Sequence, residues 1–357
     1  MDSKPDRTGY HPEWIKVNAL WNLLQRERQL TRLYQYENSL TEPMLPPASH
    51  PGFSDAFCNL MINNAKYFPP KPQNVTASPI NDEQISGNVT VRVYQPSDPT
   101  SCDKAVPLCL YAHGGGWVTG NLDTEDHFCR DICGRGDIVV VSVLYRKFPA
   151  VRFPQNTEDC VEGVLWSEAH KNATSLGVDP ARFLIMGGSA GRGLAVSTTH
   201  FLIEFHPTVP PLAGLLPISS AHIHPEGCPK SYEHLFTAYT ENAGPIPFVT
   251  DEMARGVFHL MDGEPPYDDV RNHWVPVAMG VEGVKGFPKT WLLNSGKECF
   301  RDDGRVLEAL LKETGVPVKR EVVEGMPHYY FAFPLAPDVI KHFRSRVNGG
   351  IKWCLGS

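Results

Sequence analysis

The sequence lacks an excess of positive charge, and it lacks any long apolar run. Its 357 residues include 33 Lys and Arg against 40 Asp and Glu, so the formal net charge is −7 at pH 7. No net positive field is available to hold nucleic-acid phosphates or an anionic membrane surface. No apolar stretch reaches the roughly 18 residues that a helix needs to cross a bilayer. We therefore expect no nucleic-acid partner and no stable membrane insertion.

The sequence also lacks the features of a secreted chain. Its nine cysteines are an odd number without paired spacing, and the first ten residues contain no apolar run of the kind found in secretory signals. These features predict a reduced, soluble, cytoplasmic protein with free thiols. The oligomeric state stays open, and a homodimer is the one assembly that we consider.

Short apolar runs rich in β-branched residues recur along the chain and predict strands. They lie at residues 89–94, 106–111, 138–145, 183–186, 212–218, 290–293 and 318–323. Helical patterns lie between several of them, at residues 124–134, 155–171, 191–204 and 302–314. This alternation is typical of an α/β fold with a mostly parallel sheet and helices on both of its faces.

Two segments depart from that alternation. Residues 1–80 are expected to hold N-terminal cap helices, including one over 13–34, and a connecting segment rich in Pro and Asn over 41–80. Residues 81–357 are expected to form the catalytic domain. Within that domain, residues 221–275 are rich in His, Pro and aromatic residues and predict a cap insertion above the sheet.

The stretch Gly187-Gly188-Ser189-Ala190-Gly191 lies between a predicted strand and a predicted helix. A Gly-x-Ser-x-Gly turn in that context presents the serine hydroxyl at the tip of a sharp bend. The start of the following helix offers backbone N–H groups to a developing oxyanion. Ser189 is therefore the candidate nucleophile.

A second glycine-rich stretch, His113-Gly114-Gly115-Gly116-Trp117, directly follows a predicted strand. Consecutive glycines leave backbone N–H groups unobstructed, so this loop can donate two hydrogen bonds to a negatively charged oxygen. We expect His113 to support the loop rather than to act as a base.

The candidate base and acid follow late strands, where a side chain can reach the nucleophile. His328 follows the strand predicted at 318–323, in the chain order Ser, acid, His. Three carboxylates compete for the third role. Glu298 lies closest to the end of the preceding strand, whereas Asp302 and Asp303 fit the first turn of the next helix, where acidic residues favour the helix dipole.

Taken together, these stretches resemble the hormone-sensitive-lipase-like branch of the α/β-hydrolases, over roughly residues 85 to 345. This branch includes microbial and fungal carboxylesterases and arylacetamide deacetylase. The matching motifs, in chain order, are His113 to Trp117, Tyr145-Arg146 with Phe153-Pro154, Asp159-Cys160, Gly187 to Gly191, and Gly325 to His328. The resemblance implies an α/β-hydrolase fold with an eight-stranded, mostly parallel sheet and a helical cap.

The resemblance also implies roles for individual residues. Ser189 would be the nucleophile and His328 the base, and Glu298 aligns with the third member of the triad. The oxyanion hole would come from the backbone N–H groups of Gly115, Gly116 and Ala190. No metal or organic cofactor is implied.

The chain departs from the family pattern in three places. Gly188 stands where the family usually has Asp, and Arg192-Gly193 replaces the Gly-Asn pair that usually follows the Gly-x-Ser-x-Gly turn. Glu298 replaces the usual Asp. Arg192 would oppose the helix dipole, and it is a candidate contact for an anionic substrate group. The candidate substrate-binding residues are Trp117, Arg192 and Tyr329.

Three functions stay open at this point. The first is a serine hydrolase that cleaves a small to medium hydrophobic carboxylic ester through an acyl-enzyme. The second is a non-hydrolytic enzyme of secondary metabolism that uses the same Ser/His site for dehydration, cyclisation or acyl transfer. The third is a binding module, which the presence of both Ser189 and His328 disfavours.

Overall fold

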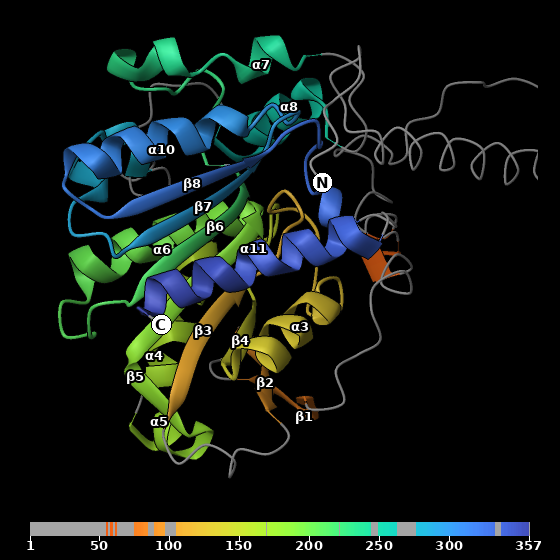
Figure 1. Ribbon diagram of the computed structural model, residues 1–357, viewed down its shortest axis with the longest axis vertical. Coiled ribbons are helices and arrows are strands. Elements are labelled where there is room, and N and C mark those ends of the chain that lie inside the picture. Colours follow the sequence, from red (N-terminus) through yellow and green to blue (C-terminus); the bar gives the residue numbers. More distant parts are fainter. Residues whose placement is uncertain are drawn as a thin grey trace, which may run out of the picture.

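The structure is a computed structural model of the chain (Figure 1). It describes residues 55, 58, 59, 61, 62, 75–84, 89–96, 105–168, 170–220, 222–243, 249–262, 276–332 and 337–356. The helix predicted over 13–34, and with it most of the predicted N-terminal cap, lies outside the described residues.

A single sheet of eight strands runs through the molecule, in the order β1-β2-β4-β3-β5-β6-β7-β8. The strands are β1 (Val75–Gln84), β2 (Thr90–Pro96), β3 (Val106–Ala112), β4 (Val139–Leu144), β5 (Val178–Ser189), β6 (Gly214–Ser220), β7 (Thr290–Ser295) and β8 (Val318–Val323). β1 pairs with β2 and β2 pairs with β4 in antiparallel fashion, and the other neighbours pair in parallel. The prediction of an eight-stranded, mostly parallel sheet is confirmed.

The central strands are apolar throughout because both faces of the sheet are covered. Successive side chains of a strand point to opposite faces, so alternate residues enter different cores. In β4, Val139, Val141 and Val143 belong to one buried cluster, whereas Val140 belongs to the other. The continuous run of β-branched residues is therefore the signature of a strand packed on both sides.

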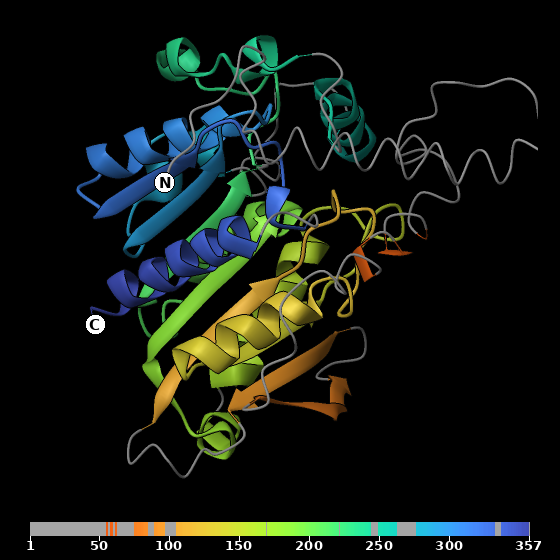
Figure 2. The same ribbon diagram turned by 45° about the vertical axis from the view of Figure 1, so that its right-hand side comes forward.

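Helices form a layer on each face of this sheet (Figures 1 and 2). One layer consists of α3 (Asp126–Gly136) and α11 (Pro337–Leu355), which contact each other and strands of the sheet. The other layer consists of α4 (Gln155–Glu168), α6 (Ala190–Phe205) and α10 (Arg301–Glu313). The short α5 (His170–Leu176) contacts α4 and β5. Helices on both faces are thus confirmed.

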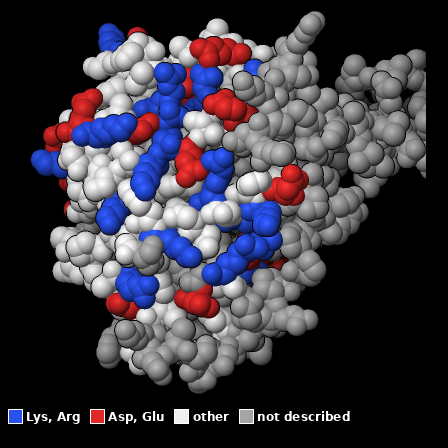
Figure 3. Space-filling model, in the orientation of Figure 1, with Lys and Arg blue, Asp and Glu red and all other residues white. Residues whose placement is uncertain are grey.

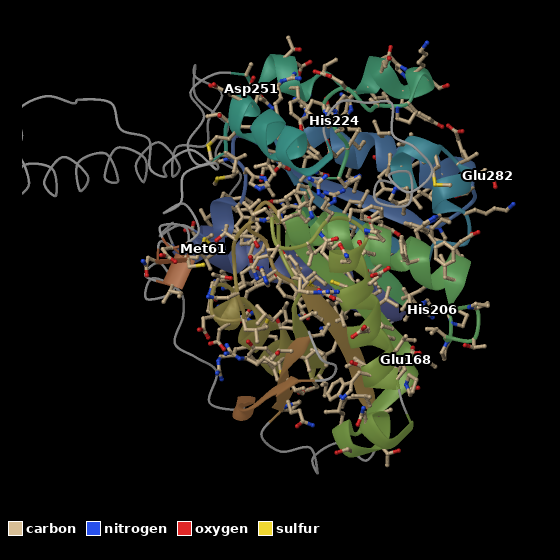
Figure 4. The ribbon with its side chains drawn as sticks, turned by 180° about the vertical axis from the view of Figure 1, so that it is seen from behind. Met61, Glu168, His206, His224, Asp251 and Glu282 are labelled. Carbon is tan, nitrogen blue, oxygen red and sulfur yellow. The ribbon has the colours of Figure 1, made fainter. Side chains whose placement is uncertain are left out.

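Between β6 and β7 the described residues form only short helices. They are the α-helices α7 (Ala238–Glu241) and α8 (Asp251–Asp262) and the 3₁₀ helices η3 (Lys230–Leu235), η4 (Pro276–Met279) and η5 (Glu282–Val284). α7 and α8 lie outside the two helical layers, at the top of Figure 1. Figure 4 shows His224 and Asp251 at this same end of the molecule. The insertion predicted at 221–275 coincides with much of this segment.

One edge of the sheet differs from the sequence-based prediction. β1 begins at Val75, inside the segment predicted to be a connection, so the predicted boundary between residues 80 and 81 falls within a strand. The register against β2 shifts between Ala77 and Asp82, around Pro79. Proline is tolerated at edge strands and bulges, and an edge strand needs no continuous apolar run. β1 therefore lacks the pattern that revealed the central strands.

The described surface carries charges of both signs. Figure 3 shows Lys and Arg side chains interspersed with Asp and Glu side chains over the described part of one face. Among the described helices, none is both long enough and apolar enough to pass through a bilayer.

Candidate active site

Ser189 ends β5 and directly precedes α6, in a backbone conformation with φ 54° and ψ −121°. A positive φ is strained for a non-glycine residue, so close packing must hold the turn. A Cβ at Gly187 would lie 2.1 Å from the carbonyl oxygen of Gly191, and a Cβ at Gly191 would lie 2.0 Å from that of Ala112. Only glycine fits at both positions. This contact explains why the motif forms a sharp bend with the serine at its tip.

The structure brings Ser189, His328 and Glu298 together in one hydrogen-bonded chain. Ser189 Oγ lies 2.7 Å from His328 Nε2, and His328 Nδ1 lies 2.6 Å from Glu298 Oε2. The serine is half-buried, whereas the other two side chains are buried. A carboxylate in this place fixes the tautomer of the imidazole and stabilises the imidazolium that forms during catalysis.

The loop after β7 holds the glutamate in place. Glu298 Oε1 accepts the backbone N–H of Ser295 at 2.9 Å, so the carboxylate folds back onto the end of its own strand. Asn242, which follows α7 in the insertion, donates its side-chain amide to the carbonyl oxygens of Gly296 and Glu298 at 3.2 and 3.0 Å. The insertion therefore braces the loop that carries Glu298.

The predicted oxyanion loop follows β3. Gly115 has φ +128°, and a Cβ there would lie 2.3 Å from the carbonyl oxygen of Thr119. The carbonyl of Gly115 accepts the backbone N–H groups of Val118 and Thr119, which closes a tight turn. Gly116 is half-buried, like Ser189. Ala190 is the first residue of α6, where a backbone N–H has no partner within the helix.

His113 is buried beneath this loop. Its ring stacks on Tyr145 with 4.4 Å between ring centroids, and its Nδ1 donates to the carbonyl oxygen of Gly114 at 2.7 Å. Burial lowers the pKa of His113 to about 3, so the imidazole stays neutral. These contacts fit the predicted supporting role.

The two competing carboxylates, Asp302 and Asp303, lie in the first turn of α10 and are fully buried. Asp303 Oδ2 accepts the backbone N–H groups of His222 and Ile223 at 2.8 and 3.0 Å. Asp302 likewise accepts the N–H groups of residues 237 and 238. Both aspartates thus anchor the insertion to α10, which is a more specific role than the expected favourable placement at the start of a helix.

The three predicted substrate contacts are all buried. The Trp117 ring packs edge to face on Phe258 of α8, with 5.4 Å between ring centroids. The Tyr329 hydroxyl donates to the carboxylate of Glu125. Arg192 has a relative exposure of 0%. The Tyr329 hydroxyl thus has an internal partner, and the contacts of Trp117, Arg192 and Tyr329 with substrate stay predictions.

Arg192 lies in the first turn of α6, where a positive charge interacts unfavourably with the helix dipole. Burial lowers the pKa of this guanidinium to about 9, while the charges of Asp303 and Glu298 act in the opposite direction. Glu298, and Asp303 once it ionises near pH 8, therefore offset a cation that would otherwise be unfavourable at the start of a helix.

Sequence reasoning missed two residues of this region, Glu125 and Asn242. Asn242 donates to a main-chain carbonyl 56 positions away, and Glu125 accepts the hydroxyl of Tyr329 204 positions away, so no local pattern marks either residue. Among the residues that the structure describes, no group of three His, Cys, Asp or Glu side chains is placed to hold a metal ion.

Comparisons with known proteins agree with this fold. A family model described as the alpha/beta hydrolase fold matches residues 109–332. The versiconal hemiacetal acetate esterase of Dothistroma septosporum is 33% identical over 250 residues, which are 70% of this chain and 74% of the relative. A carboxylesterase of Mycobacterium tuberculosis is 29% identical over 274 residues, which are 75% of this chain and 79% of the relative.

Two solved structures resemble the chain over most of its length. A bacterial heroin esterase superposes with a TM-score of 0.74 and 25% identity, covering 88% of this chain and 95% of that one. Vibralactone cyclase superposes with a TM-score of 0.77 and 24% identity, covering 100% of this chain and 96% of that one. The second likeness shows the fold alone.

The chain belongs to the α/β-hydrolase fold family, in its hormone-sensitive-lipase-like branch. Homologues in this branch are esterases and carboxylesterases of the carboxylic ester hydrolase class. The predicted family and fold class are therefore confirmed.

Proposed function

We propose that the chain hydrolyses small to medium hydrophobic carboxylic esters through an acyl-enzyme on Ser189. The observation that carries this proposal is the continuous chain from Ser189 through His328 to Glu298, with spacings of 2.7 and 2.6 Å. Such spacings lie within the range needed for proton transfer between a nucleophile, a base and its orienting acid.

The first half of the reaction forms the acyl-enzyme. Ser189 Oγ attacks the ester carbonyl carbon while its proton moves to His328 Nε2, and the carbonyl electron pair moves onto oxygen. The imidazolium is stabilised by Glu298, which keeps its negative charge. When the oxyanion collapses, the alcohol leaves with the proton from His328.

The second half releases the acid. His328 takes a proton from water, and the resulting hydroxide attacks the acyl carbon on Ser189. Collapse of the second oxyanion breaks the bond to Ser189 Oγ, which regains its proton from His328. In both halves we assign the backbone N–H groups of Gly115, Gly116 and Ala190 to the oxyanion, each donor being worth roughly 3 kcal/mol in the transition state.

The surroundings of the oxyanion loop support a hydrophobic substrate. Side-chain carbons of Val118 and Val257 lie 3.8 Å from the position that a Cβ on Gly116 would take. Val257 belongs to α8, so the insertion contributes apolar surface beside the proposed hole. Apolar walls favour an apolar acyl or alcohol group over a charged one.

A panel of nitrophenyl esters of increasing chain length tests this proposal. We expect turnover by the parent chain and a loss of at least about 10³-fold in kcat for Ser189→Ala. Ser167→Ala is the matched control, because Ser167 donates to the carbonyl of Gly163 within α4 and should keep full activity.

Three outcomes would contradict the proposal in different ways. Activity that persists in Ser189→Ala would remove the nucleophile that we assign. Failure of the parent chain to cleave any ester, with Ser189 still reactive, would favour the non-hydrolytic reaction. Inertness of Ser189 toward an organophosphonate would favour the binding module.

A further inference from the structure

A second buried glutamate, Glu125, joins segments of the site that are far apart in the sequence. Its Oε1 accepts the backbone N–H of Gly114 at 2.9 Å and also the hydroxyl of Tyr329. Its Oε2 accepts the hydroxyl of Tyr111, near the end of β3. Glu125 has a relative exposure of 4%, and both tyrosines are buried.

Two of these partners are next to the residues that we assign to catalysis. Gly114 directly precedes the oxyanion glycines Gly115 and Gly116, and Tyr329 directly follows the base His328. One carboxylate oxygen therefore connects the oxyanion loop with the loop that carries the base. The two loops are otherwise separated by about two hundred residues, since Glu125 and Tyr329 lie 204 positions apart.

The turn Gly187–Gly191, which carries Ser189 and is called the elbow below, packs against the Tyr329 hydroxyl. A Cβ at Gly188 would lie 2.5 Å from the Tyr329 hydroxyl oxygen, so only glycine fits before Ser189. A Cβ at Gly114 would lie 3.0 Å from that oxygen and 3.2 Å from the carbonyl oxygen of Gly188. The elbow, the oxyanion loop and the base loop thus meet around one phenol group.

Tyr329 adopts an unusual conformation to reach this place. Its φ is 58°, in the left-handed region that bulky residues rarely enter. Strain of this kind persists only where surrounding contacts fix the residue. Those contacts are the hydrogen bond to Glu125 and packing on Phe331, with 4.4 Å between ring centroids.

The chemistry of the three donors suits a carboxylate. Two phenols and one backbone N–H all donate, and an ionised carboxylate is an acceptor only. Burial raises the pKa of Glu125, and its three hydrogen bonds act to lower it. A glutamine in the same place would replace one of the two acceptor oxygens with an NH₂ group, so Tyr111 on one side, or Gly114 and Tyr329 on the other, would lose the acceptor to which they donate.

We propose that Glu125 is a positioning residue, which through Gly114 and Tyr329 sets the oxyanion loop at the correct distance from Ser189 and His328. This inference rests on the proposed esterase function and adds to it a residue that touches no reacting atom. A misplaced oxyanion donor weakens binding of the transition state much more than binding of the ester. Loss of the cluster should therefore lower kcat and leave KM nearly unchanged.

Three variants test the proposal. Glu125→Gln should lower kcat about 30-fold and Tyr329→Phe about 10-fold on a nitrophenyl ester, with KM within about threefold of the parent value. Tyr94→Phe is the matched control, because it also removes one tyrosine hydroxyl. That hydroxyl donates at 3.2 Å to Asp126, the residue next to Glu125. That variant should keep the parent kcat.

A trifluoromethyl ketone separates positioning from a merely structural role. Attack of Ser189 on this ketone leaves an oxyanion in the proposed hole, so its inhibition constant should rise by about the same factor as kcat/KM falls. The proposal is overturned if folded Glu125→Gln and Tyr329→Phe keep kcat within about twofold. It is also overturned if kcat falls while the inhibition constant stays at the parent value.

The positioning role can still be tested if Glu125→Gln does not fold or if the parent chain cleaves no ester. If Glu125→Gln does not fold, Tyr329→Phe decides, because it keeps the ring and removes only one donor. If the parent chain cleaves no ester, the proposed function fails, and the rate at which a fluorophosphonate labels Ser189 then tests the inference. That reaction builds charge on a phosphoryl oxygen in the same hole, so slow labelling of both variants would support the positioning role and parent-like rates would overturn it.

Discussion

Two buried glutamates lie next to the proposed site. Glu298 lies in the loop after β7, and Glu125 directly precedes α3. Each carboxylate accepts a backbone N–H at 2.9 Å, from Ser295 and from Gly114 respectively. Their remaining partners differ. Glu298 faces His328, which gains a proton in the proposed reaction, whereas Glu125 faces two phenols whose pKa values burial raises well above the ordinary value.

This difference predicts that Glu298 contributes to catalysis through its charge and that Glu125 contributes by holding other groups in position. A carboxylate beside a group that becomes charged contributes to the barrier through electrostatics, and neutralising it should be very costly. A carboxylate whose partners stay neutral contributes by holding positions, and its loss should cost less. The same residue type thus serves two purposes, and each can be tested separately.

The largest expected effect comes from removing the charge of Glu298. Glu298→Gln should lower kcat by about 10³-fold, because glutamine cannot offset the imidazolium and favours the wrong tautomer of His328. Asp302→Asn is the matched control, since the partners of Asp302 are Arg301 and N–H groups of the insertion. Its kcat should stay within about threefold of the parent value. The reverse order of these two effects would show that the wrong carboxylate has been assigned.

A smaller effect should follow from crowding the Glu125 cluster. Gly188→Ala puts a methyl group 2.5 Å from the Tyr329 hydroxyl, and we expect it to lower the free energy of unfolding by about 2 kcal/mol. Gly349→Ala in α11 is the control, because a Cβ there meets nothing within 4 Å and alanine should stabilise the helix by roughly 0.5–1 kcal/mol. Urea unfolding measures both. Equal stability of Gly188→Ala and the parent would show that Tyr329 does not hold this space.

The buried carboxyl group of Asp303 should make the free energy of unfolding depend on pH. Burial raises the pKa of Asp303 from 3.8 to about 8, so the folded chain binds a proton that the unfolded chain has released. Its contribution to the free energy of unfolding is therefore complete below about pH 4 and is lost as the pH rises toward 8. Asp303→Asn keeps an oxygen acceptor for His222 and Ile223 but does not titrate.

The unfolding free energies of the parent and of Asp303→Asn should therefore diverge with pH. Between about pH 5 and pH 7 the parent should lose about 1.3 kcal/mol per pH unit relative to the variant, close to the limit of about 1.4 for one proton, and the slope should flatten as the pH approaches 8. Chemical denaturation at several pH values measures this slope. Parallel curves would contradict the raised pKa and would indicate an ionised Asp303 at neutral pH.

The parts of the site that the sequence predicts are those with local rules. Gly187 and Gly191 are required by contacts of their own backbone, so their spacing marks the elbow around Ser189. His328 and Glu298 follow strands of a parallel sheet, and the carboxyl ends of such strands meet at one edge. β4 is equally visible, because burial on both faces requires a continuous apolar run.

The parts that the sequence does not predict depend on remote contacts. Glu125 lies among acidic residues at the start of a helix, a pattern that also fits an exposed helix terminus. Tyr329 follows His328, and the sequence does not predict that its hydroxyl donates to a carboxylate 204 positions away. Only the packed fold determines the direction of such side chains. The sequence does not predict β1 either, because an edge strand needs no continuous apolar run.

The most direct test of the account is to locate the reactive hydroxyl. The chain is treated with a fluorophosphonate, digested, and the modified peptide is identified by mass spectrometry. We predict an adduct on Ser189 that is absent from Ser189→Ala and forms far more slowly in His328→Ala. An adduct on another residue, formed at the same rate in Ser189→Ala as in the parent, would contradict the assigned nucleophile and the mechanism built on it.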